Sequence, residues 1–191
     1  MRVNEIFYSL QGEGFFTGTA AVFIRLSGCN LRCSFCDTDH EAGCEMSVQE
    51  IADAILPYPT RHAVITGGEP GLQLSDRLVS LLHSLGYFIQ VETNGSRELP
   101  EGIDWITCSP KYAPVVLRRV DELKVVYEGK QSIAALMAAK TTIPAKHLSV
   151  QPCHTPDPER NAEILAECID FVKANPEWRL SLQTHKLLNI P

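Results

Sequence analysis

Short apolar segments alternate with amphipathic segments along nearly the whole chain, and this alternation constrains the fold more than any other feature. The segments expected as strands are Ala21–Leu26, Ala63–Thr66, Phe88–Glu92, Trp105–Cys108, Leu123–Tyr127, Leu148–Gln151 and Leu180–Thr184. Those expected as helices are Ser47–Leu56, Ser75–Leu85, Gln131–Ala139 and Glu159–Lys173. Such alternation predicts an α/β fold with a parallel sheet and right-handed crossover connections. Because the strands are too few for a complete eight-stranded barrel with its helices, we expect a compact partial (incomplete) TIM-like barrel.

Polar or glycine-rich runs follow several of these strands. The runs are Cys29–Thr38, Thr66–Pro70, Glu92–Gly95, Ser109–Lys111 and Gln151–His154. In parallel sheets and barrels, the carboxyl ends of the strands form the edge that carries the active site. We therefore expect the runs to converge around one opening.

Composition and charge exclude several classes of protein. The chain has 191 residues, enough for one domain over residues 1–191 with a substantial core. The net charge is −6 and no cluster of Lys and Arg stands out, so we expect no nucleic-acid partner. No signal peptide or membrane-spanning run is present, which predicts a cytoplasmic protein without a membrane partner. In a reducing compartment, the seven cysteines indicate cluster ligands and free thiols rather than disulfides.

Three cysteines lie in one short run with the spacing C-x3-C-x2-C: Cys29, Cys33 and Cys36, with Phe35 before the last. Three thiolates can hold three irons of a cubane [4Fe–4S] cluster, whose usual ligation needs a fourth cysteine. A missing fourth ligand leaves one iron open to bind another molecule. Cys44 could instead complete a four-cysteine zinc site or a closed electron-transfer cluster. The spacing argues against zinc, because zinc sites usually use two C-x2-C pairs and no second pair exists.

The cysteine run resembles the motif of the radical S-adenosylmethionine (SAM) superfamily, whose usual core is a partial barrel. The resemblance implies that Cys29, Cys33 and Cys36 ligate a [4Fe–4S] cluster and that the open iron binds SAM. It also implies SAM contacts at strand ends, from Phe35, Gly68, Glu92, Ser109, Pro110, Lys111, Gln151, Pro152, Cys153 and His154. Without the resemblance, Gly67–Pro70 and Asn94-Gly95 would be interpreted as ordinary turns.

Several ordered motifs resemble the 7-carboxy-7-deazaguanine synthase family. They are LQGEG, FIRLSGCNLRCSFCDT, TGGEP, ETNG and SPK, and the resemblance spans nearly the whole chain. It implies conversion of 6-carboxy-5,6,7,8-tetrahydropterin to 7-carboxy-7-deazaguanine with loss of ammonia, a step towards queuosine and related 7-deazapurines. It also implies that SAM is regenerated and that Mg2+ takes part.

The same resemblance implies a set of substrate-binding residues: Leu10, Gln11, Gly12, Glu13, Arg25, Thr66, His185 and the C-terminal Pro191. Their chemistry suits a pterin. Gln11 can satisfy its donor and acceptor edge, and Glu13 can pair with its N–H groups. Arg25 can hold a carboxylate through forked hydrogen bonds. For Mg2+ the resemblance implies the Thr38 hydroxyl, with Asp37 as the carboxylate alternative.

Two other functions remain open. A glycyl-radical-enzyme activase shares the cysteine run, but the LQGEG run and His185 argue against it. A non-catalytic metal or electron-transfer protein would need Cys44 as a fourth ligand. The family resemblance further implies a homodimer and an external electron donor such as flavodoxin. The sequence assigns no individual role to Cys44 or Cys153.

Overall fold

The computed structural model describes residues 1–36, 38–39, 42–111 and 114–191. Across these residues one sheet has the strand order β3-β1-β2-β4-β5-β6-β7-β8-β9. All neighbours from β2 to β9 are parallel, whereas β1 pairs antiparallel with β2 and with β3. The bounds are β1 (Arg2–Leu10), β2 (Ala20–Leu26), β3 (Cys44–Glu45), β4 (His62–Gly67), β5 (Phe88–Thr93), β6 (Trp105–Cys108), β7 (Val120–Tyr127), β8 (Ala145–Pro152) and β9 (Trp178–Leu180). The expected α/β fold with an open, partial barrel is confirmed.

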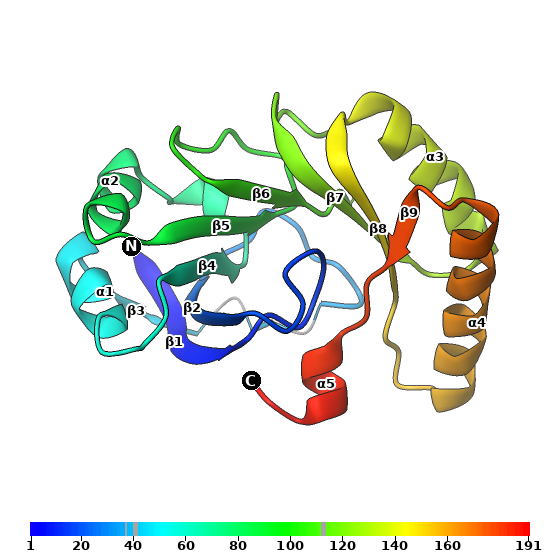
Figure 1. Cartoon of the computed structure of the whole chain (residues 1–191), viewed down its shortest axis with the longest axis horizontal. Helices are drawn as coiled ribbons and strands as arrows, with labels where there is room; N and C mark the ends of the chain where they lie inside the picture. Colours follow the sequence, from blue (N-terminus) through cyan, green and yellow to red (C-terminus); the bar gives the residue numbers. More distant parts are fainter. Residues whose placement is uncertain (37, 40–41, 112–113) are drawn as a thin grey trace.

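Helices cover both halves of this sheet, α1 and α2 beside β1 to β5, and α3 and α4 beside β7 to β9 (Figure 1). Each half has its own apolar core, in which α1 and α2 pack on β2, β4 and β5, and α3 and α4 pack on β7 and β8. A capping box at Ser47 and Glu50 begins α1, as the sequence predicts. The bounds are α1 (Val48–Ile55), α2 (Asp76–Ser84), α3 (Ile133–Thr142), α4 (Pro158–Ala174) and α5 (Thr184–Leu188), with 3-10 turns η1 (Pro70–Leu72) and η2 (Lys130–Ser132).

Alternate residues of the strands separate the helix-covered core from the interior of the barrel. On β5, Ile89 and Val91 join the core, while Gln90 and Glu92 make polar contacts on the other face. Successive side chains of a strand point to opposite faces of the sheet. Polar residues at every second position therefore line the barrel interior, while the residues between them stay in the apolar core. This alternation places the polar residues of β5 and β7 in one site.

One predicted strand differs from the structure, and the long first strand was not predicted. The segment Leu180–Thr184 was expected as a strand, but β9 ends at Leu180 and Thr184 begins α5. The chain leaves the sheet because the backbone N–H of Thr184 bonds to the carbonyl of Gly12 instead of to a strand. The structure also contains β1, which the sequence analysis missed. Only Val3 and Ser9 of β1 are buried, so this strand lacks the periodic apolar pattern of a core strand.

Candidate active site

A cleft of about 680 Å³ lies where the polar runs after the parallel strands meet the N- and C-terminal segments of the chain. The predicted convergence of these runs around one opening is confirmed, with part of the run after β8 outside the cleft. The predicted site residues that line the cleft are Leu10, Gln11, Gly12, Glu13, Arg25, Cys29, Cys33, Phe35, Cys36, Thr38, Thr66, Gly68, Glu92, Ser109, Lys111, Gln151, His185 and Pro191.

Four predicted residues are not part of this lining: Pro110, Pro152, Cys153 and His154. Pro110 lines a smaller cavity formed with residues of α3. Cys153 is buried in the core cluster of β7, β8 and α4, and burial raises the pKa of its thiol. His154 is exposed. A SAM contact from these four residues therefore stays a prediction, whereas Gln151 from the same run does face the cleft.

The cysteine loop supplies three free thiols to the cleft, with Cys36 exposed and Cys29 and Cys33 half-buried. Burial raises the pKa of the Cys29 and Cys33 thiols, and the Cys36 thiol nearby adds to the rise. Thiols with raised pKa values are deprotonated by the positive charge of a metal centre that they ligate.

The described residues contain no group of three Cys, His, Asp or Glu side chains placed to bind a single metal ion. In a cubane cluster each thiolate binds a different iron, so its three ligands stand further apart than those of one ion. The fourth thiol of the zinc interpretation, Cys44, is exposed on β3 and does not line the cleft. The donor set thus fits an iron–sulfur cluster with an open iron.

Glu69 joins two of the loops around the cleft. Its buried carboxylate accepts hydrogen bonds from the Thr93 hydroxyl at 2.6 Å, the Asn94 N–H at 2.8 Å and the Gly71 N–H at 2.9 Å. Gly68 lies against the cysteine loop, where a Cβ atom would collide with the carbonyl group of Gly28. Glu69 therefore fixes the loop after β4 to the loop after β5, and Gly68 permits both to approach the cysteines.

Lys111 brings the run after β6 to the cysteine loop. Its ammonium group donates to the Ser109 hydroxyl at 2.6 Å and lies 5.3 Å from the centre of the Phe35 ring. Burial, and then the charge of Lys124, lower the pKa of Lys111. A partly desolvated cation beside a cluster loop suits an anionic group of a bound cofactor.

Arg25 lies on β2, which is covered by β1 and β4 and is not an edge strand. Its guanidinium donates to Glu5 at 2.6 Å and to the Thr38 hydroxyl at 3.4 Å, and it lies 5.4 Å from the centre of the Phe7 ring. Phe7 stacks on Phe23 with ring centres 4.9 Å apart, and both line the cleft. This aromatic wall was missed in the sequence, because Phe7 lies on the unpredicted strand β1.

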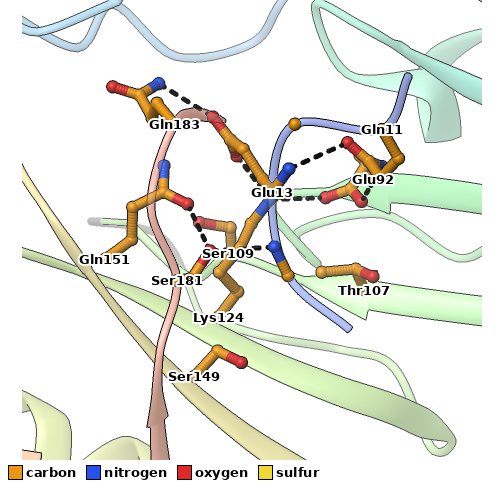
Figure 2. A network of polar contacts seen from close by, with 12 residues as sticks. Gln11, Glu13, Glu92, Thr107, Ser109, Lys124, Ser149, Gln151, Ser181 and Gln183 are labelled. Atoms are coloured by element: carbon orange, nitrogen blue, oxygen red, sulfur yellow. Dashed lines mark hydrogen bonds and ion pairs between the residues drawn. The ribbon is translucent and has the colours of Figure 1, made fainter. Parts of the chain in front are cut away.

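A buried ion triad forms another part of the lining (Figure 2). The ammonium of Lys124 contacts Glu13 at 2.6 Å and Glu92 at 2.9 Å, and its side chain is only 6% exposed. Burial disfavours the ionised form of Glu13, but Lys124 and Gln183 outweigh it and lower the pKa of Glu13 to about 2. Burial raises the pKa of Glu92, with Lys124 opposing and Glu13 adding to the rise. The triad carries two carboxylates around one cation.

Sequence analysis missed Lys124 and Gln183 at this site. Lys124 interrupts the apolar run of β7 two residues after Glu122, so both side chains point to the barrel interior. Two charged residues two positions apart in an apolar strand were the sequence signal that could have identified Lys124. Gln183 donates to Glu13 at 2.8 Å from the segment wrongly predicted as a strand.

Asp37, the alternative carboxylate ligand for Mg2+, lies outside the described residues. Among the residues that the structure covers, no helix is both long and apolar enough to cross a membrane.

Comparisons with known proteins agree with this geometry. The sequence profile of the Radical SAM superfamily matches residues 23–139. The chain is 50% identical over 190 residues to the 7-carboxy-7-deazaguanine synthase of Bacteroides thetaiotaomicron, covering 99% of this chain and 98% of that protein. It is 43% identical over 213 residues to the synthase of Bradyrhizobium diazoefficiens, covering 98% of each. The crystal structure of QueE from Escherichia coli superposes with a TM-score of 0.81 at 31% identity, covering 95% of this chain and 92% of that one.

The open barrel, the three-cysteine loop and the matching profile define a radical SAM enzyme. Identity over the full length then narrows the class, and the chain belongs to the 7-carboxy-7-deazaguanine synthase family. A [4Fe–4S] cluster and SAM follow from the superfamily. The glycyl-radical activase and the four-cysteine metal protein are not favoured.

Proposed function

We propose that the protein converts 6-carboxy-5,6,7,8-tetrahydropterin to 7-carboxy-7-deazaguanine and ammonia, as a radical SAM lyase whose domain spans residues 1–191. The observation that carries this proposal is the set of side chains that line the cleft. Three cysteines, an arginine and a pair of buried carboxylates line one cavity of about 680 Å³, the size range of small-molecule sites.

Cys29, Cys33 and Cys36 are the residues that would hold the cluster. Gly68, Glu92, Ser109, Lys111 and Gln151 line the same cleft, and with Phe35 they are the proposed SAM contacts. When bound there, the cluster and SAM would supply the radical chemistry of hydrogen-atom removal from the substrate. The protein orients the substrate and excludes competing reactions.

Arg25 holds the substrate carboxylate in this proposal. A guanidinium offers paired N–H donors that match a carboxylate, and here it already has an acidic partner, Glu5, that fixes its position. Gln11 and Glu13 bind the opposite, amino-substituted edge of the pterin. Gln183, which donates to Glu13, holds that carboxylate in place. Thr66, His185 and the carboxylate of Pro191 complete the pocket from the strand end and the C-terminus.

Mg2+ belongs to the proposal through Thr38. The Thr38 hydroxyl lines the cleft and already contacts the Arg25 guanidinium, so it lies beside the proposed carboxylate site. A hydroxyl is a hard oxygen ligand, and Mg2+ commonly adds waters and substrate oxygens to such a ligand. We further propose a cytoplasmic homodimer that takes its electron from a donor such as flavodoxin.

An anaerobic assay tests the proposal. The protein is reconstituted with iron and sulfide, reduced, and mixed with SAM, Mg2+ and 6-carboxytetrahydropterin. We expect 7-carboxy-7-deazaguanine by mass and ultraviolet absorbance, with SAM undiminished. Cleavage of SAM to 5′-deoxyadenosine without product would overturn the substrate but keep the radical SAM class. The Arg25→Lys variant keeps the positive charge but loses the paired N–H donors of the guanidinium. A raised KM for the pterin in this variant would support Arg25 as the carboxylate site.

A further inference from the structure

Lys124 is the most deeply buried cation of the cleft lining, and the proposed function gives it no role. Its side chain is 6% exposed, while those of its partners Glu13 and Glu92 are 20% and 15% exposed. The lysine is therefore the least exposed of the three side chains, all of which line the cleft. A ligand that reaches the triad meets more exposed surface from the two carboxylate side chains than from the lysine side chain.

The contacts of Glu13 leave it little freedom. One carboxylate oxygen accepts from Lys124 at 2.6 Å, and the other accepts from Gln183 at 2.8 Å. The backbone N–H of Glu13 donates to Gln11 at 3.2 Å. The loop is also held two residues later, where Glu122 accepts from the Phe15 N–H at 3.1 Å. Strand β7 thus contacts this loop at two points, through Glu122 and Lys124.

The protonation state of Glu13 decides which ligand atoms it can bind. An ionised carboxylate only accepts hydrogen bonds, whereas a protonated one can also donate. The charged groups that act on Glu13 are Lys124 from β7, Glu92 from β5, Lys111 from the run after β6 and His185 from the C-terminal segment. Lys124 dominates these electrostatic effects and holds the pKa of Glu13 at about 2.

Without Lys124, two carboxylates would face each other in a buried site with no cation between them. Two like charges that share a buried site raise the pKa of one of the groups strongly, and such a pair can share one proton. One carboxyl group of the pair would then become a hydrogen-bond donor near neutral pH.

We propose that Lys124 is a specificity-determining residue: by fixing Glu13 as a hydrogen-bond acceptor, it makes the cleft select a 2-amino-pterin ring over its 2-oxo (lumazine) analogue. This inference rests on the proposed function, because it takes the pterin ring as the ligand of Glu13. The 2-amino group presents N–H donors to the carboxylate. A 2-oxo group presents a lone pair, which an ionised carboxylate repels and leaves unpaired.

Binding of two stable ring analogues tests the inference without turnover. Dissociation constants of pterin-6-carboxylate and lumazine-6-carboxylate are measured by their fluorescence at pH 7, on anaerobic holoenzyme with SAM and Mg2+. We expect the wild-type protein to prefer the pterin by at least about tenfold. In Lys124→Met this preference falls to about twofold or less, and Lys124→Arg retains most of it. The ratio separates specificity from folding, since a damaged pocket weakens both ligands together.

The matched control is Lys140→Met, which removes a lysine from an exposed ion pair with Glu177 at 2.5 Å. It leaves both dissociation constants unchanged. An unchanged ratio of the two dissociation constants in Lys124→Met would overturn the inference, even if both analogues bind more weakly. If the wild-type protein forms product but shows no preference, the inference is also wrong. If it neither forms product nor binds either analogue, the proposed function itself fails.

Discussion

The carbonyl oxygen of Gly12 accepts two hydrogen bonds from Thr184, one from the backbone N–H at 2.9 Å and one from the hydroxyl at 3.0 Å. A second contact between these segments is the hydrogen bond that the Ser9 hydroxyl donates to a carboxylate oxygen of Pro191 at 2.9 Å. Gly12 itself leaves no room for a side chain, since a Cβ atom there would collide with His185. The two ends of the chain therefore build one wall of the cleft together.

A peptide tag fused after Pro191 tests this wall. The fusion removes the terminal carboxylate and displaces the last residues, so we expect the KM for the pterin to rise about tenfold or more. The melting temperature should change little, because α5 has no buried residue. Ser9→Ala removes one tie without altering the terminus and should raise KM by a smaller factor. Unchanged KM values in both proteins would contradict a binding role for the C-terminus.

Glu69→Gln is expected to destabilise the protein by about 2 kcal/mol. The new glutamine would place an NH2 donor against a backbone N–H that in the wild-type protein donates to the Glu69 carboxylate, so this N–H would lose its acceptor. Glu69 is fully buried and serves three donors. The midpoint of urea unfolding measures the change. Glu101→Gln is the control, since Glu101 is exposed. Equal midpoints for the two variants would mean that Glu69 does not hold the loops after β4 and β5.

Cys44→Ala separates the open cluster from a four-cysteine site. We expect the reconstituted variant to hold about four iron atoms per chain, as the wild-type protein does, because all three thiols that ligate the cluster are intact. Cys33→Ala should lose most of the iron, as one of three ligands is missing. Iron analysis and the visible absorption spectrum provide the readout. Loss of iron from Cys44→Ala would show that Cys44 is a ligand.

His62 should make the folded state sensitive to mild acid. Burial lowers its pKa below the ordinary value of 6.5 for a histidine, although a hydrogen bond with Gln90 at 2.9 Å opposes the shift. Below pH 6.5 the unfolded chain therefore binds a proton that the folded chain does not, and stability falls as the pH falls. This slope is limited to about 1.4 kcal/mol per pH unit.

The measurement is urea unfolding at pH 7 and at pH 5.5, for the wild-type protein and for His62→Gln. We expect a smaller loss of stability between the two pH values in the variant. The control is His83→Gln, at a half-exposed histidine. If the His62 and His83 variants show the same pH dependence as the wild-type protein, burial of His62 is not the cause.

Much of the fold was predictable from local pattern. The capping box at Ser47 begins α1, and the apolar run at residues 21–26 lies within β2. The first and last elements were not predictable in this way. Strand β1 has few buried positions, and α5 has none, so neither carries an apolar period. Strand β1 is held by its ladder with the next strand, β2, whereas α5 begins at a contact with the distant Gly12.

The sequence by itself determined the chemistry that is local to one loop and the alternation of strands and helices along the chain. The spacing of Cys29, Cys33 and Cys36 and the polar runs after the strands depend only on neighbouring residues. Only the tertiary structure decided that Lys124 joins Glu13 to Glu92 and that Thr184 meets Gly12. These contacts link residues that are 32 to 172 positions apart. The curvature and register of the sheet bring them together, and no local propensity encodes such distances.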